Sequence, residues 1–137
     1  MPIDKLKLII GIMPDWRLLE HRTARGQSHF GEFVAGLADA KDIKDAAVLT
    51  GALAALGNQL REPRSKALDD GLFELRGTTM RIYYGFLPGR RVVLLGGYVK
   101  KRTDTPPDIL RLMRARLKEA QNDYQKFRAG TAGKKGR

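Results

Sequence analysis

Residues 71–86 have the sequence GLFELRGTTMRIYYGF. Two runs in which apolar and polar residues alternate flank a short Gly-Thr-Thr turn, and an alternation of period two is typical of half-buried strands with one solvated face. Arg76 lies on the polar side of the first run, and Arg81 lies on the polar side of the second. The stretch therefore predicts an antiparallel hairpin that carries two arginines on its solvated face.

Two registers of this hairpin keep the apolar sides together. One register places Arg76 opposite Arg81, and the other places Glu74 opposite Arg81. Like charges directly opposite each other cost roughly 0.2–1 kcal/mol, whereas a phosphate between two guanidinium groups would reverse that sign, because arginine matches phosphate oxygens in bidentate geometry. The alternative is that Glu74 neutralises Arg81 and that nothing binds.

The segments around the hairpin predict an α+β fold. The order is strand, helix, helix, three strands and helix, which is typical of a small, largely antiparallel sheet with two N-terminal helices packed on one face and a C-terminal helix. The expected flanking elements are a strand within 15–22, a helix that starts after Ser28, a helix over about 42–60, a strand over 92–99 and a helix that starts after Thr105.

Individual residues predict where some of these elements begin and end. Ser28 and Thr105 are expected N-caps, and Pro106 is expected at the first helical position. Pro63 forces the residue before it away from helical angles and so ends the second helix. The near-continuous apolar run VVLLGGYV indicates a strand covered on both faces, in the middle of the sheet. Its two glycines indicate a close approach of other groups to the backbone.

The chain of 137 residues predicts one domain with a modest core. We expect this domain over residues 15–127. Residues 1–14 form an N-terminal extension, and residues 128–137 are small, polar and basic, which is typical of a disordered tail. No apolar stretch approaches the roughly 20 residues of a membrane span, and the start does not resemble a signal peptide, so we expect a cytoplasmic protein.

The formal net charge of +11 is concentrated in one part of the chain. Residues 1–60 carry seven basic and seven acidic residues, whereas residues 61–137 carry nineteen basic and eight acidic ones. A basic excess of this kind favours a nucleic-acid partner. A solvated basic surface or attraction to anionic lipid is the alternative.

Several kinds of chemistry are excluded. The absence of cysteine removes disulfides, thiolate nucleophiles and Cys-based zinc sites. His21 and His29, the only histidines, lie in the electrically neutral part and are expected to be surface or packing residues. The side chains that remain available for catalysis are arginine, lysine and tyrosine around a basic surface. That set suits RNA scission by the neighbouring 2′-hydroxyl, with a lysine or tyrosine as proton acceptor and arginines on the phosphate, and it requires no metal or cofactor.

Several motifs in order resemble the phage-derived branch of the RelE/HigB toxin family. That branch shows a Lys-x-Leu element, a Gly-Leu-x-Glu-Leu-Arg strand, a second strand with an arginine, and a late Lys-Lys followed by Thr-Pro. The matching positions are residues 66–68, residues 71–76, Arg81, residues 100–101 and residues 105–106. The motifs cover about half of the chain, and the order of elements extends the resemblance over nearly all of it.

The resemblance implies a RelE-like fold and the toxin of a type II toxin–antitoxin pair. Such toxins cut mRNA in the ribosomal A site and are neutralised by a co-encoded antitoxin with a helix-turn-helix domain. By position, Arg76 and Arg81 would hold and stabilise the scissile phosphate, and Tyr98, or Lys100 and Lys101, would supply proton transfer or base stacking. The residues expected to contact RNA are Lys66, Tyr83, Lys101 and Arg102.

Two other functions remain open on the sequence. One is a non-enzymatic toxin of the same fold that resembles ParE and acts by binding DNA gyrase. Toxins of that kind lack a cationic RNA site on the sheet, so the pair of arginines favours cleavage. The other is a plain RNA-binding module, whose sheet arginines would only contact phosphates.

Overall fold

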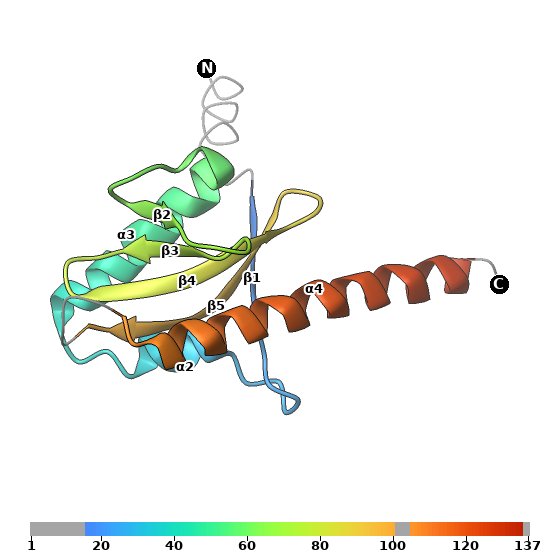
Figure 1. Ribbon diagram of the computed structural model, residues 1–137, viewed down its shortest axis with the longest axis horizontal. Coiled ribbons are helices and arrows are strands. Elements are labelled where there is room, and N and C mark those ends of the chain that lie inside the picture. Colours follow the sequence, from blue (N-terminus) through green and yellow to red (C-terminus); the bar gives the residue numbers. More distant parts are fainter. Residues whose placement is uncertain (1–15, 101–104, 136–137) are drawn as a thin grey trace, which may run out of the picture.

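The computed structural model describes residues 16–100 and 105–135, with side chains as far as Tyr124. Five strands form one sheet in the order β1-β5-β4-β3-β2 (Figure 1). All neighbours are antiparallel except β1, which runs parallel to β5. The strands are β1 (Arg17–Glu20), β2 (Ser65–Ala67), β3 (Phe73–Arg76), β4 (Met80–Leu87) and β5 (Arg91–Val99), and the helices are α2 (His29–Ala35), α3 (Ala40–Leu56) and α4 (Pro107–Lys135).

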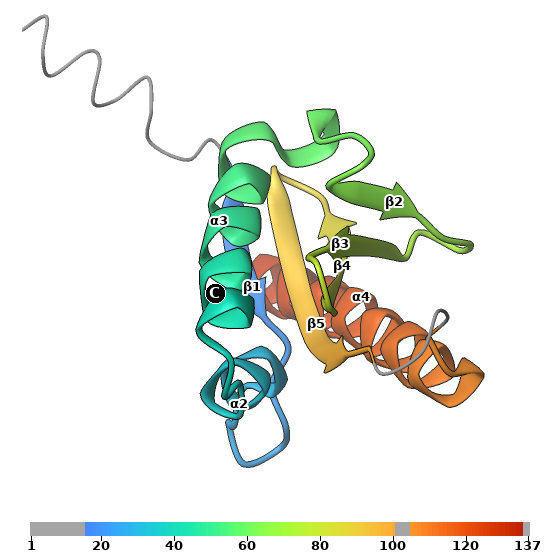
Figure 2. The same ribbon diagram turned by 90° about the vertical axis from the view of Figure 1, so that its left-hand side faces the viewer.

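Helices cover both faces of the sheet (Figure 2). Helices α2 and α3 lie on one face, where Leu49 and Leu53 pack with Ile82 and Leu94. Helix α4 crosses the other face, where Met113 and Leu117 belong to a second cluster that includes Tyr83, Val93 and Leu95. The predicted α+β fold, with two N-terminal helices on one face and a C-terminal helix, is confirmed.

Some limits differ from those predicted. Ser28 caps α2 as expected, because its hydroxyl accepts a hydrogen bond from the backbone N–H of Gly31. Helix α3, however, ends at Leu56 rather than just before Pro63, because the backbone of its C-cap, Gly57, turns to φ +53°. Helix α4 begins at Pro107, one residue later than expected, and extends to Lys135, into the segment predicted to be a tail. The division of the chain at residues 14 and 127 stays a prediction.

The sheet also contains a strand that the sequence pattern did not predict. Strand β2 is only three residues long and pairs with β3 at the edge of the sheet. Strand β4, not β5, is the central strand. Strand β5 is nonetheless interior, with a neighbour on each side and buried residues on both faces.

A β-bulge in β5 decides which side chains share a face near the end of that strand. Tyr83 pairs with Gly96 and Tyr84 pairs with Leu94, so the register shifts by one residue between them. Because successive side chains alternate across a sheet, this shift moves Tyr98 to the α4 face. The predicted close approach at the two glycines is confirmed: a Cβ on Gly97 would lie 2.4 Å from the Phe33 ring, and one on Gly96 would lie 2.8 Å from Arg116 Nη1.

Polar contacts hold α4 on its face of the sheet. Arg116 donates a hydrogen bond to the Leu95 carbonyl (2.9 Å), and His21 Nε2 lies 2.7 Å from Glu119 Oε1. The His21 ring stacks on His29, whose pKa is lowered by burial and by the nearby Arg116. Both histidines are therefore packing residues, as predicted. Within the described residues, no helix is long and apolar enough to cross a membrane.

Candidate functional site

The two arginines of the hairpin lie directly opposite each other. Arg76 of β3 pairs with Arg81 of β4, and Arg81 pairs with Tyr98 of β5, so the three side chains form one row across the sheet. The neighbouring row consists of Lys66, Glu74 and Tyr83. Of the two registers that the sequence allowed, the structure has the one with the arginines opposed.

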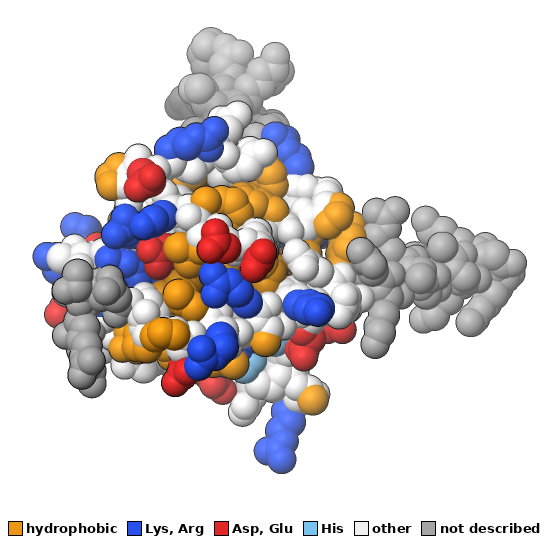
Figure 3. Space-filling model, viewed as in Figure 1, with side chains coloured by type: hydrophobic (Ala, Val, Ile, Leu, Met, Phe, Trp, Pro, Cys, Tyr) orange, Lys and Arg blue, Asp and Glu red, His pale blue; other side chains and the backbone are white. Residues whose placement is uncertain are grey.

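Both rows lie on the face that α4 crosses. Tyr83 and Tyr98 belong to the cluster that contains the apolar side of α4. In the view of Figure 3, Lys and Arg side chains gather on the left of this face, over the end of the sheet where β3 turns into β4. The site is therefore at one end of the sheet, beside the start of α4.

Glu74 stands between the two guanidinium groups. Its Oε2 lies 3.6 Å from Arg76 Nε and 4.0 Å from Arg81 Nε. The Glu74 side chain is 10% exposed and that of Arg81 is 9% exposed, whereas that of Arg76 is 33% exposed. One carboxylate thus offsets part of the repulsion between the arginines, and Arg76 is the member of the pair that solvent or a ligand reaches more easily.

Arg81 is fixed by the turn that it follows. Its Nη1 donates hydrogen bonds to the carbonyls of Gly77 (2.7 Å) and Met80 (2.9 Å), while its Nε is buried without a hydrogen-bond partner. The prediction that Arg81 lies on a solvated face was wrong. The residue is 7% exposed, and its guanidinium lies against the carbonyls of the hairpin turn and beside Glu74.

Helix α3 holds the same turn from the other side of the sheet. Asp45 Oδ2 accepts a hydrogen bond from the Thr78 backbone N–H (3.0 Å), and Asp42 Oδ1 accepts one from the Thr79 hydroxyl (2.7 Å). The turn is thereby bonded to two side chains near the start of α3. The position of the Arg81 guanidinium depends on these bonds, since it donates to the Gly77 carbonyl of this turn.

Tyr83 does not lie where a nucleic acid could reach it. The prediction placed it on a solvated face as an RNA contact, but the side chain is fully buried under α4. Its hydroxyl is 2.7 Å from Thr105 Oγ1, which ties the start of α4 to the sheet. Burial raises the pKa of Tyr83 to about 12, so the phenol stays protonated at neutral pH. We assign Tyr83 a supporting role.

The other predicted site residues are Tyr98, Lys100, Lys66, Lys101 and Arg102. Tyr98 is half-buried and completes the arginine row. The backbone N–H of Lys100 donates to the Thr79 carbonyl (2.7 Å), which places Lys100 beside the hairpin turn. Lys66 is exposed on edge strand β2, opposite Glu74. Lys101 and Arg102 lie outside the described residues.

The sequence pattern did not indicate the role of Glu62. Its Oε1 lies 4.0 Å from Arg76 Nη1, from the segment that precedes β2. The backbone N–H of Arg76 also bonds the Arg64 carbonyl (2.8 Å), so this segment lies beside the open end of β3. The missed strand β2 is what brings the segment there, and a run of three residues gives no periodicity from which to predict it.

The arrangement suits an anion better than a metal ion. Two guanidinium groups and one carboxylate give the centre a net positive charge, with Lys66 and Lys100 nearby. Among the described residues, there is no group of three or more histidine or acidic side chains that could hold a metal ion.

Removing the carboxylate tests whether this centre attracts a polyanion. We expect Glu74→Gln to raise the affinity for a short single-stranded RNA about fivefold at low salt, because the centre gains a unit of positive charge at a largely buried position. The affinity is measured by fluorescence anisotropy at several salt concentrations. Glu32→Gln, on exposed helix α2, makes the same change in net charge elsewhere, and an equal effect of both variants would contradict a local site.

Fold and site together define a class of small α+β proteins with a RelE-like architecture and a cationic centre on the sheet. Residues 37–118 match the model of the family described as phage-derived protein Gp49-like (DUF891). The match covers more than half of the chain, and the protein belongs to this family, a RelE-like family associated with toxin–antitoxin systems. No curated protein matches the chain.

Proposed function

We propose that this protein is the toxin of a type II toxin–antitoxin pair, and that it inhibits translation by cutting mRNA in the ribosomal A site. The observation that carries the proposal is the row formed by Arg76, Arg81 and Tyr98 on one face of the sheet. Membership of a toxin–antitoxin-associated family supports it. The partner that neutralises the toxin would be a co-encoded antitoxin with a helix-turn-helix domain.

The proposed reaction uses the RNA's own 2′-hydroxyl as the nucleophile. The oxygen of this group attacks the adjacent phosphorus as its proton passes to a base, and the 5′-oxygen of the next nucleotide leaves and takes up a proton. The products are a 2′,3′-cyclic phosphate and a 5′-hydroxyl. No metal-bound water is needed, since the nucleophile belongs to the substrate, and the developing charge on the phosphate oxygens is stabilised by the arginines.

Each side chain has a proposed role in this reaction. Arg76, the more exposed arginine, binds the phosphate, and Arg81, which the turn holds in place, stabilises the charge that builds up on it. Tyr98 or Lys100 exchanges the protons. Lys66 contacts the RNA backbone from β2, as would Lys101 and Arg102.

A non-catalytic RNA-binding module is the second candidate. It is favoured by the bonds of Arg81 to two carbonyls and by its closeness to Glu74, because a guanidinium occupied in this way is less available to a phosphate. On this alternative, Arg76 and the lysines would bind RNA electrostatically, without cleavage.

A translation reaction separates the candidates. We expect that adding the purified protein stops synthesis, and that mapping of 5′ ends on the mRNA finds ribosome-dependent cuts that leave 5′-hydroxyl ends. Inhibition with intact mRNA would contradict cleavage and support the binding module. A parallel supercoiling assay with DNA gyrase tests the ParE-like alternative: loss of supercoiling activity while mRNA stays whole would overturn the proposal in its favour.

A further inference from the structure

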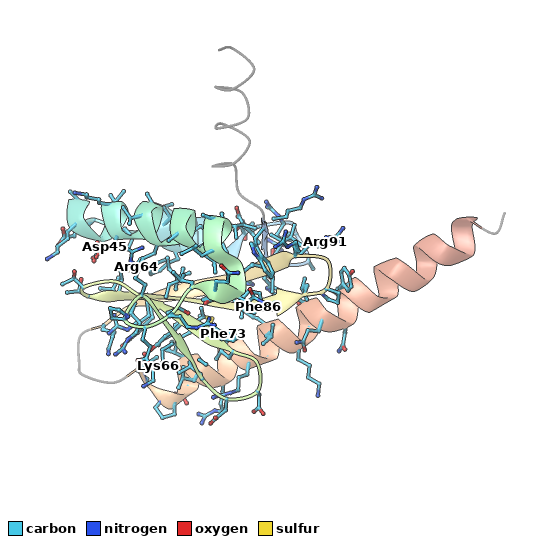
Figure 4. All side chains as sticks on the ribbon, turned by 90° about the horizontal axis from the view of Figure 1, so that it is seen from above. Asp45, Arg64, Lys66, Phe73, Phe86 and Arg91 are labelled. Carbon is cyan, nitrogen blue, oxygen red and sulfur yellow. The ribbon has the colours of Figure 1, made fainter. Side chains whose placement is uncertain are left out.

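An aromatic cavity of about 310 Å³ opens on the opposite face of the sheet from the arginine row. Phe73, Tyr84 and Phe86 line it. Tyr84 belongs to the core cluster under α3, and the two phenylalanines pack against that cluster. Figure 4 shows Phe73 and Phe86 close together near the end of α3. The other walls come from the segment between α3 and β2, through Leu60, and from Ala67 of β2.

The rings are arranged so that they support one another and still leave surface uncovered. The Phe73 centroid lies 5.4 Å from that of Tyr84 in a stacked arrangement and 5.1 Å from that of Phe86 in an edge-on one. Phe73 and Phe86 are half-buried, whereas Tyr84 is 1% exposed. Partly exposed aromatic rings that line a cavity are the kind of surface on which planar ligands stack.

The rim of the cavity is polar and charged. Arg61 Nη1 donates a hydrogen bond to the Asn58 carbonyl (2.6 Å), which holds the guanidinium at the rim, and Glu62 lies beside it. At the floor, the Tyr84 hydroxyl is hydrogen-bonded to Ser65 Oγ. A guanidinium has five N–H donors and a carboxylate has several acceptor sites, so Arg61 and Glu62 can keep these contacts and still pair with a heterocycle that has donors and acceptors on its edge.

The cavity is adjacent to the arginine row around the edge of the sheet. Glu62, which lines the cavity, lies 4.0 Å from Arg76 Nη1. A ligand held at Arg76 therefore has a short path past Glu62 to the aromatic rings. Strand β2 pairs with residues 73–75 of β3, so it does not extend alongside Arg76.

We propose that this cavity binds one unpaired nucleobase of the RNA whose backbone phosphate is held by Arg76. The inference rests on the proposed function and adds to it a base-recognition subsite on the far side of the β2–β3 edge. Base–aromatic stacking supplies the affinity, and the side chains of Asn58, Arg61 and Glu62 supply the hydrogen bonds that distinguish one base from another.

The test uses nucleosides, which carry no phosphate and so report on the cavity independently of Arg76 and Arg81. Trp16 is the only tryptophan of the chain, and its ring centroid lies 5.4 Å from that of Phe86. We expect adenosine, guanosine, cytidine or uridine, titrated separately, to change Trp16 fluorescence saturably, with at least one base preferred. No saturable change with any of the four would overturn the proposal.

Two variants localise the binding. Phe73→Leu removes a ring, and we expect the dissociation constant to rise about five- to hundredfold, the range of one lost base–aromatic stack. Ala67→Leu leaves the rings in place and fills the mouth from an exposed position on β2, so binding should be lost with the melting temperature unchanged. Phe30→Leu in α2 and Ala55→Leu on the exposed side of α3 are the matched controls, and equal losses in the controls would contradict the assignment.

Nucleoside binding tests the base subsite, and mRNA cleavage tests the nuclease, so the two proposals can fail independently. Saturable nucleoside binding that Ala67→Leu abolishes supports the subsite even if mRNA stays whole. Cuts in mRNA that have the same base preference in Ala67→Leu as in the wild type would overturn the subsite and leave the nuclease intact. A response to apolar amino-acid amides but not to nucleosides would also overturn it and indicate a protein partner.

Discussion

Arg81→Ala is expected to slow mRNA cutting by about 10²–10³-fold, because one preorganised donor to the charge that develops in the transition state contributes about that factor. The rate is measured as the appearance of cut mRNA in a translation reaction. Arg111→Ala is the matched control, since Arg111 lies on the exposed side of α4 with a side chain that is 70% exposed and pairs with Asp108.

The folding of the Arg81 variant needs its own check, because Arg81 bonds two carbonyls of the turn and lies close to Glu74. The melting temperature of Arg81→Ala supplies that check, and Arg76→Ala is a second test of the pair, since Arg76 is a third exposed and its loss disturbs the interior less. We expect it to bind RNA more weakly and cut at least tenfold more slowly, with a melting temperature near that of the wild type. Normal cutting by Arg76→Ala would contradict the paired role of the arginines.

Gly57→Ala is expected to lower the free energy of unfolding by about 3 kcal/mol. Gly57 ends α3 with φ +53° and ψ −123°, a conformation that only glycine adopts easily. A Cβ there would lie 2.0 Å from the Trp16 ring, so the ring that lies next to Phe86 and the aromatic cavity would have to move. Urea unfolding followed by Trp16 fluorescence measures both the stability and the displacement.

Gly51→Ala is the control for this substitution. Gly51 lies within α3, and a Cβ there would have no neighbour within 4 Å. We expect it to raise stability by about 0.5–1 kcal/mol, because alanine favours the helix and restricts the unfolded chain. Equal stability of the two variants would show that neither backbone strain nor contact with Trp16 matters at Gly57.

The sequence predicted most of the sheet because the strands of the hairpin have a strict period of two. Phe73 and Leu75 pack on one core while Glu74 and Arg76 turn to the other face, as the alternation requires. The alternation cannot tell what covers the polar face. Tyr83 illustrates this. The alternation correctly placed Tyr83 on the same face as Arg81, but it could not show that α4, which comes from residues far along the chain, covers Tyr83.

Bulges and short strands escaped prediction for a different reason. The bulge at Leu95 and Gly96 is set by pairing with Tyr83 and Tyr84 across the sheet. The apolar run VVLLGGYV has no alternation of apolar and polar residues that a bulge would interrupt, so its pattern does not predict one. Strand β2 is a strand because its three residues pair with β3. The arginine pair could therefore be found from the sequence, whereas the aromatic cavity and the contact of Glu62 with Arg76 could not.

A single 2′-deoxynucleotide in the mRNA shows whether the substrate's own 2′-hydroxyl is the nucleophile. With the deoxynucleotide on the 5′ side of the bond that is normally cut in the A site, we expect cleavage at that bond to disappear while binding of the protein to the stalled ribosome persists, because the nucleophile is missing and the phosphate contacts of Arg76 and Arg81 remain. Cleavage at the same bond despite the missing 2′-hydroxyl would contradict the mechanism.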